Sequence, residues 1–223
     1  MRPVPRAVLF DLDGTLLDTA PDMIGALNAL RSEHALGALS TARVRPAVSH
    51  GSARLVQLGF PEAAGEDFVR LQRRFLEIYG ARLSAETRLF EGMAAVLAQL
   101  AARGLAIGIV TNKPARLTEA LLRDLALRDL FACVVSGDSL PQRKPHPLPM
   151  LHAAAAANAS PAECIYVGDA QRDVQAAHAA GMPALVATYG YLGEDEDWRV
   201  WGADGFIDRP LELLAWLGRR AAS

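Results

Sequence analysis

The stretch that decides the fold is Val8-Leu9-Phe10-Asp11-Leu12-Asp13-Gly14-Thr15, where an apolar run ends in two aspartates one residue apart. An apolar run of this length before turn residues is typical of a parallel strand buried on both faces. If the strand continued, Asp11 and Asp13 would share one side, because residues i and i+2 of a strand do so. Two carboxylates at a buried strand end need charge compensation, and such oxygen ligands suit Mg²⁺. The other interpretation is a solvated D-G turn.

Composition limits the classes of protein to consider. The chain has 223 residues, enough for one large domain or a core with a smaller insertion, and its 51% apolar and 22% charged residues are usual for a globular protein. The net charge of −2 gives no electrostatic footprint for nucleic acid or an anionic membrane. No apolar run approaches the roughly 20 residues that span a bilayer. We therefore expect neither nucleic-acid nor membrane partners.

The cysteines and the N-terminal residues indicate the cellular compartment in which the protein is expected. Cys133 and Cys164 lie in or beside apolar runs, which predicts buried free thiols and a reducing environment. The six residues before the first apolar run leave no room for a secretion signal. We expect a cytoplasmic protein, and a homodimer is compatible with these observations.

Lysine usage is unusual, because the chain has 21 arginines but only two lysines, Lys113 and Lys144. An ammonium is a compact point charge, whereas a guanidinium is a planar fork. The two lysines therefore indicate positions where an ammonium is specifically needed, against the alternative of chance retention at the surface. For Lys113 we expect a side chain that faces solvent or the inserted helices.

Strand and helix patterns alternate along most of the chain. Apolar, β-branched runs occur at Ala7–Phe10, Ala106–Thr111, Cys133–Ser136, Cys164–Gly168 and Ala184–Thr188. Helical patterns occur at Ala94–Arg103, Pro114–Leu125, Pro147–Asn158 and Gln171–Ala180, and a short strand at Gly205–Ile207 precedes a last helix opened by Pro210. This order predicts an α/β fold with a Rossmann-like parallel sheet. Polar residues follow the strands and should meet at their carboxyl ends.

The segment from Leu17 to Phe90 departs from this alternation. It contains no convincing strand and reads as helices over Pro21–Glu33, Thr41–Leu58 and Glu62–Leu83. A βαβ crossover needs only about a dozen residues. We therefore expect an inserted helical cap subdomain over 17–87, above a core formed by 1–16 and 88–223.

Four polar motifs at strand ends carry the chemistry. They are Asp11-Leu12-Asp13-Gly14-Thr15, Thr111-Asn112, Lys144 within Arg143-Lys144-Pro145, and Gly168-Asp169 followed by Asp173. Carboxylates can bind Mg²⁺, a hydroxyl and backbone amides can bind phosphoryl oxygens, and a lysine can offset charge, which suffices for phosphoryl transfer. Structural alternatives are a turn at Thr111, a helix N-cap at Asp169 and a first-turn acid at Asp173.

The four motifs, in this order, resemble those of haloacid dehalogenase-like hydrolases over essentially the whole chain. The stretch 137–147 is similar to phosphoglycolate phosphatases, and segments 189–191 and 201–204 are similar also to N-acetylmuramic acid 6-phosphate phosphatases. The resemblance implies Mg²⁺-dependent hydrolysis of a small phosphorylated metabolite through an aspartyl-phosphate. We expect 2-phosphoglycolate as the substrate, with the muramate ester as the alternative.

The resemblance also implies roles for the four aspartates. Asp11 would be the nucleophile, and Asp13 would act as general acid and then base. Mg²⁺ would be held by Asp11, the main-chain carbonyl of Asp13, and Asp169. Asp173 would bind the ion directly or act through one of the groups that bind it.

Further residues would bind the phosphoryl group and the rest of the substrate. By the same resemblance, Thr111 and the backbone amide of Asn112 would hold the phosphoryl group, while Lys144 would orient the nucleophile. The small, polar break at 48–54 is the expected place of substrate choice. The residues there are Ser49, His50, Gly51 and Arg54, with Ser52 able to begin a helix whose free amides face an anion. The alternative is an ordinary helix–helix turn.

Single residues distinguish this chain from related proteins that catalyse other reactions. Dehalogenases resemble this chain but lack the second aspartate, so Asp13 argues against that activity. Phosphonate-cleaving relatives need a lysine in the cap, and 17–90 contains none. Sugar-phosphate mutases usually carry a small apolar residue where Thr15 stands, which favours a hydrolase. A non-catalytic interaction module would not need all four polar strand ends.

Overall fold

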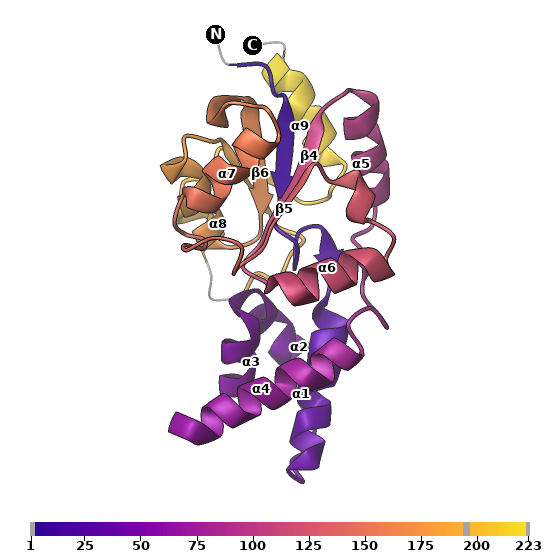
Figure 1. The fold of residues 1–223 in the computed structure, drawn as a ribbon, viewed down its shortest axis with the longest axis vertical. Helices are drawn as coiled ribbons and strands as arrows, with labels where there is room; N and C mark the ends of the chain where they lie inside the picture. Colours follow the sequence, from indigo (N-terminus) through magenta and orange to yellow (C-terminus); the bar gives the residue numbers. More distant parts are fainter. Residues whose placement is uncertain (1–2, 194–196, 222–223) are drawn as a thin grey trace.

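The computed structural model describes residues 3–193 and 197–221, and its centre is a six-stranded parallel sheet (Figure 1). Across the sheet the strands follow the order β5 (Cys133–Val135), β4 (Ala106–Val110), β1 (Ala7–Phe10), β6 (Cys164–Gly168), β7 (Ala184–Ala187) and β8 (Gly205–Ile207). The strand β1 is therefore central, with parallel neighbours β4 and β6 on its two sides. The expected α/β fold is confirmed.

Helices cover both faces of the sheet because β1 buries both sets of its side chains. Val8 and Phe10 belong to the apolar cluster on the face of α5 (Met93–Ala102) and α9 (Glu212–Ala221). Ala7 and Leu9 belong to the cluster on the face of α7 (Leu148–Ala156) and α8 (Gln171–Ala179). This arrangement explains the continuous apolar run before Asp11.

Four helices form a group of their own beyond the carboxyl end of β1 (Figure 1). They are α1 (Ala20–Glu33), α2 (Thr41–Val44), α3 (Gly51–Gly59) and α4 (Gly65–Ala81), and we call them the helical group. Leu27, Leu55 and Phe75 are wholly buried and belong to the apolar cluster that runs through this group. The helix α6 (Ala115–Asp124) lies between the group and the sheet (Figure 1).

The predicted helix over Thr41–Leu58 is interrupted. After α2 comes a 3-10 helix, η1 (Arg45–His50), and α3 begins only at Gly51. Pro46 stands at the start of η1, and Gly51 has φ +76°, a left-handed conformation that favours glycine. The break lies where the small, polar segment 48–54 indicated one.

The expectation of no strand between Leu17 and Phe90 was wrong at both ends of that segment. A two-residue strand β2 (Leu17–Asp18) pairs antiparallel with β3 (Arg88–Leu89). Such short strands give no alternation in the sequence. The ribbon brings together the two chain segments that lead into and out of the helical group.

The remaining elements are short, and they connect the layers of the fold. They are three 3-10 helices, η2 (Arg128–Leu130), η3 (Pro161–Glu163) and η4 (Trp198–Trp201). Cys133 and Cys164 are buried free thiols, as predicted. Within the described ranges, no helix has the length and apolar character needed to cross a membrane.

Candidate active site

The chain turns sharply after β1, and this turn separates the two aspartates of the first motif. The strand ends at Phe10, and the Asp11 amide still donates to Val167 of β6 (2.9 Å). Gly14 then has φ +85°, and a Cβ there would overlap the Asp169 carboxylate. A glycine is therefore required by both the backbone and the approach of Asp169.

Three aspartates gather at the carboxyl ends of β1 and β6. Oxygen atoms of Asp11, Asp169 and Asp173 lie within 4.8 Å of one another, and all three residues are buried. Burial raises the pKa of Asp169 to about 7, and repulsion from Asp11 and Asp173 adds to the rise. Asp169 Oδ1 has no hydrogen-bond partner. Hard carboxylate oxygens, one of them unpaired, fit a divalent cation well.

Lys144 and Arg172 are the cations that the protein supplies near this cluster, and Lys144 contacts two of the aspartates directly. Its Nζ lies 3.0 Å from Asp11 Oδ1 and 2.7 Å from Asp173 Oδ1. It also donates to the Val110 carbonyl (2.9 Å) and the Tyr166 hydroxyl (2.8 Å), and its side chain is wholly buried. Lys144 therefore connects the candidate nucleophile to a candidate metal ligand.

Residues after β4 hold the Lys144 segment in place. The Asn112 amide Nδ2 donates to the Lys144 carbonyl (2.9 Å), and Asn112 Oδ1 accepts from the Lys144 amide (3.1 Å). The Thr111 hydroxyl accepts from the Lys113 amide (3.2 Å), which is the turn that the sequence left as an alternative. The second and third motifs are therefore adjacent in the fold, as the strand ends predicted.

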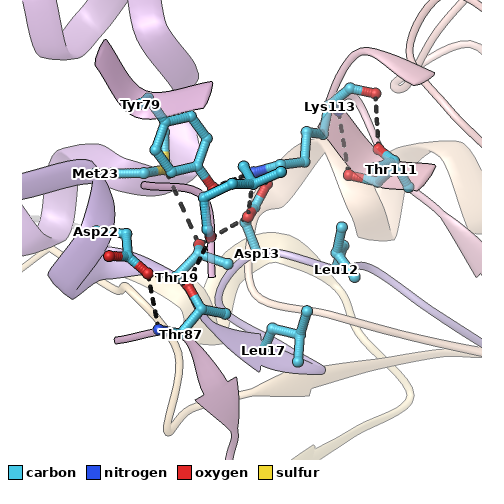
Figure 2. A network of polar contacts seen from close by, with 12 residues as sticks. Leu12, Asp13, Leu17, Thr19, Asp22, Met23, Tyr79, Thr87, Thr111 and Lys113 are labelled. Carbon is cyan, nitrogen blue, oxygen red and sulfur yellow. Dashed lines mark hydrogen bonds and ion pairs between the residues drawn. The ribbon is translucent and has the colours of Figure 1, made fainter. Parts of the chain in front are cut away.

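The carboxylate of Asp13 lies outside the cluster of three aspartates. It accepts from Lys113 Nζ (2.9 Å) and from Thr19 Oγ1 (2.7 Å) (Figure 2). The strand ends at Phe10, before either residue, so the strand geometry on which the expectation of a shared side depended does not apply to Asp11 and Asp13. The two carboxylates face different partners.

Lys113 is not at the surface. Its side chain is 3% exposed, and its Nζ donates to the hydroxyl of Tyr79 on α4 (2.7 Å) (Figure 2). Of the two surroundings expected for Lys113, solvent and the inserted helices, the structure shows the second.

The segment 48–54 reaches the carboxylates through Ser49. Its Oγ donates to Asp169 Oδ2 (2.6 Å), and its carbonyl accepts from Arg172 on α8 (2.7 Å). His50 and Arg54 are exposed, and Gly51 is the first residue of α3. Ser52 does not begin α3, and its hydroxyl instead accepts from Gln72 on α4 (3.0 Å).

The start of α8 settles two structural alternatives. Its N-cap is Ala170, so the N-cap interpretation of Asp169 was wrong. Asp173 is a first-turn acid whose Oδ2 accepts from the Ala170 amide (3.0 Å), while its Oδ1 faces Lys144. Burial raises the pKa of Asp173, Lys144 opposes the rise, and Asp11 adds to it.

Sequence reasoning did not anticipate the role of Tyr191. Its hydroxyl accepts from the amides of Thr19 (2.6 Å) and Ala20 (2.9 Å), and its own amide donates to Asp169 Oδ2 (3.0 Å). Arg45 lies over the Tyr191 ring at 4.9 Å and makes two 3.0 Å bonds to Asp18. These contacts join residues more than 20 positions apart in the sequence, and no local pattern signals them.

The fold and this site define an α/β protein with a cluster of buried carboxylates and a buried lysine at the carboxyl ends of its parallel strands. A family model described as haloacid dehalogenase-like hydrolase matches residues 8–187. The chain belongs to this family, as the motifs indicated.

Individual relatives share most of the chain. It is 44% identical over 209 residues to a phosphoglycolate phosphatase of Xanthomonas campestris pv. campestris, covering 94% of this chain and 95% of the relative. It is 40% identical over 211 residues to an N-acetylmuramic acid 6-phosphate phosphatase of Pseudomonas putida, covering 93% and 94%. A crystal structure of a predicted phosphoglycolate phosphatase from Haemophilus somnus superposes with a TM-score of 0.86 at 28% identity, covering 97% and 99%.

Proposed function

We propose that this protein is a Mg²⁺-dependent phosphatase that hydrolyses 2-phosphoglycolate to glycolate and phosphate, with Asp11 as the nucleophile. The observation that carries the proposal is the buried site of Asp11, Asp169 and Asp173, joined to Lys144 at 3.0 and 2.7 Å. The 44% identity to a phosphoglycolate phosphatase supports the choice of ester.

The reaction would proceed in two transfers of the same phosphoryl group. Asp11 Oδ attacks phosphorus, the bond from phosphorus to the ester oxygen breaks, and the leaving alkoxide takes a proton from the Asp13 carboxyl group. Asp13, now ionised, takes a proton from water, whose oxygen attacks phosphorus and displaces Asp11 as a carboxylate. The products are glycolate and inorganic phosphate, and Asp11 and Asp13 return to their starting forms.

The residues around Asp11 would prepare it for attack. Lys144 holds Asp11 Oδ1 and offsets the charge that gathers around phosphorus. The Thr111 hydroxyl and the Asn112 backbone amide would bind phosphoryl oxygens, since both follow β4 on the same edge of the sheet as Asp11. Asn112 also holds the Lys144 backbone, so one residue serves two parts of the site.

A Mg²⁺ ion would be held by Asp11, Asp169, the main-chain carbonyl of Asp13, and Asp173 directly or through water. When bound, the ion draws negative charge from the phosphoryl oxygens. The unpaired Asp169 Oδ1 and the raised pKa of Asp169 support a cation there, because a cation would compensate the buried charge.

The helical group would act as a cap over this site, within a subdomain spanning 17–87. The 2.6 Å bond from Ser49 to Asp169 supports this, because it places the segment 48–54 against the carboxylates. We propose that Ser49, Gly51, His50 and Arg54 meet the organic part of the substrate. The ribbon of β2 and β3 is the natural boundary of such a subdomain.

N-acetylmuramic acid 6-phosphate is the second candidate substrate, favoured by the 40% identity to a phosphatase of that name. The two esters differ greatly in size. A steady-state assay should therefore compare kcat/KM for 2-phosphoglycolate, N-acetylmuramic acid 6-phosphate and a hexose phosphate. We expect the highest value for 2-phosphoglycolate. A higher value for the muramate ester would assign the second function, and no release of phosphate from any ester would reject both.

We further propose that the protein acts in the cytoplasm on a free metabolite, without nucleic-acid or membrane partners. The buried free thiols and the net charge of −2 support this. The homodimer that the sequence allows would be detected as a doubled mass in light scattering.

A further inference from the structure

Lys113 forms a buried polar bridge between the helical group and Asp13. Its Nζ lies 2.9 and 3.3 Å from the two carboxylate oxygens of Asp13 and 2.7 Å from the Tyr79 hydroxyl (Figure 2). Tyr79 belongs to α4, Lys113 follows β4, and Asp13 follows β1. Three segments far apart in the sequence therefore meet at one ammonium group.

Hydrogen bonds hold the backbone of Lys113 at the point from which its side chain starts. The Lys113 amide donates to Thr111 Oγ1 (3.2 Å), and its carbonyl accepts from the Gly137 amide (2.9 Å). The ammonium also lies 4.6 Å from the centre of the Tyr79 ring, within the range of a cation–π contact.

The chemistry of the three groups favours one arrangement. The attraction of Asp13 and Tyr79 outweighs the burial that would lower the pKa of Lys113, so the net shift is upward and the amine stays charged. Burial raises the pKa of Tyr79 to about 12, so the phenol stays neutral and accepts from Lys113. The compact ammonium of a lysine can donate to two acceptors that lie in different directions. The planar guanidinium of an arginine would instead favour a bidentate pair with the carboxylate alone. This explains why a chain so poor in lysine keeps one here.

We infer that Lys113 is a positioning residue for Asp13, and that the Tyr79 hydroxyl, on α4, holds the Lys113 ammonium in place. The inference rests on the proposed function, in which the Asp13 carboxyl protonates the leaving group. Lys113 would set the position of that carboxyl group together with Thr19, which donates to Asp13 Oδ1 (2.7 Å), and α4 would contribute through the Tyr79 hydroxyl.

This role has a kinetic signature that a purely structural role lacks. An alkyl ester such as 2-phosphoglycolate leaves as a strongly basic alkoxide and depends on a placed proton donor, whereas p-nitrophenyl phosphate leaves as a stable phenolate. Proton transfer by a positioned side chain contributes about 10²- to 10⁴-fold. Loss of the position of Asp13 should therefore damage hydrolysis of the alkyl ester selectively.

The test is kcat/KM for both esters, measured with Mg²⁺ in the wild type and in Lys113→Met and Tyr79→Phe. For Lys113→Met we expect a loss of about 100-fold or more with 2-phosphoglycolate and less than about 5-fold with p-nitrophenyl phosphate. For Tyr79→Phe, which keeps the ring, we expect a selective loss of about 3- to 10-fold, the net worth of one hydrogen bond. Equal losses on both esters, or no loss, would overturn the inference.

A matched control removes a different hydrogen bond near the end of the helical group. Ser84 Oγ donates to Asp124 at the end of α6 (3.0 Å), a bond that involves none of Asp13, Lys113 and Tyr79. We expect Ser84→Ala to keep both kcat/KM values within about 2-fold of the wild type. Because Tyr79→Phe is a mild change, it keeps the test decisive if Lys113→Met fails to fold. A wild type that hydrolyses neither ester would reject the proposed function, whereas an active wild type with unselective variants would reject only this inference.

Discussion

Lys144 Nζ lies 3.0 Å from Asp11 Oδ1, and the two side chains are 0% and 4% exposed. A buried pair of this kind is stable only if further bonds satisfy both groups. Lys144 meets that condition through Asp173, the Val110 carbonyl and the Tyr166 hydroxyl. The ammonium thus sits among acceptors that approach from several directions, which a planar guanidinium cannot reproduce.

Substitution of Lys144 should affect activity and folding to different degrees. Lys144→Arg keeps the charge but not the geometry, and we expect kcat/KM for 2-phosphoglycolate to fall by about 100-fold or more. Lys144→Met leaves Asp11 and Asp173 buried without their partner, and we expect a loss of about 3–5 kcal/mol in the free energy of unfolding. Steady-state assays and urea denaturation measure the two effects. Wild-type activity in Lys144→Arg would contradict the role of the point charge.

Removal of divalent cations should abolish the phosphatase activity. Asp11, Asp169 and Asp173 bring three carboxylates together, and the nearby cations Lys144 and Arg172 are fewer than the carboxylates, so the site has room for the charge of a metal ion. We expect EDTA to abolish phosphate release and added Mg²⁺ to restore it, while Ca²⁺ serves as the control for a cation of different size and geometry. Full activity after chelation and dialysis would refute the metal requirement.

The raised pKa of Asp169 predicts how stability depends on pH in the metal-free protein. This pKa is about 7 in the fold, because of burial and of repulsion from Asp11 and Asp173, and roughly 3.9 in an unfolded chain. Between these values the folded protein holds a proton that the unfolded chain has lost, so the contribution of Asp169 to stability falls as pH rises. Asp169→Asn removes this titration.

The measurement is the free energy of unfolding of wild type and Asp169→Asn in EDTA from about pH 5 to 8. We expect the variant to gain stability relative to the wild type as pH rises across this window. A difference that stays constant with pH would show that Asp169 does not carry the raised pKa.

The two thiols should resist alkylation in the folded protein. Burial raises the pKa of Cys133, and burial raises the pKa of Cys164 to about 11 with a further contribution from Cys133. The thiolate is the reactive form, so we expect slow labelling by iodoacetamide at pH 8 and rapid labelling of both residues in urea. Mass spectrometry counts the labels, and prompt labelling of either thiol in the native protein would contradict its buried state.

Local patterns were enough to predict the sheet. The strands Ala7–Phe10 and Cys164–Gly168 have the bounds that their apolar runs indicated, because both are buried on two faces and bordered by polar residues. The helix expected over Thr41–Leu58 was less well predicted, since Pro46 and Gly51 interrupt it. The ribbon of Leu17–Asp18 with Arg88–Leu89 depends on contacts between distant segments and leaves no local pattern.

The candidate site, like the fold, was predicted in part from the sequence. The residues at the strand ends, such as Asp11 and Asp169, do meet, because parallel strands end at one edge of the sheet. The direction of the Asp13 side chain could not be predicted, since it depends on the turn at Gly14 and on Lys113. The scarcity of lysine marked Lys113 as unusual, but only the fold shows that Tyr79 is its partner.

Phosphate release from 2-phosphoglycolate by wild type and Asp11→Asn tests the central claim most directly. Asp11→Asn keeps the size of the side chain but removes the carboxylate that would attack phosphorus and bind Lys144. The account predicts Mg²⁺-dependent release by the wild type and a loss of at least about 1,000-fold in the variant, since a covalent nucleophile has no substitute in the site. Activity of Asp11→Asn within tenfold of the wild type, in protein of unchanged thermal stability, would contradict it.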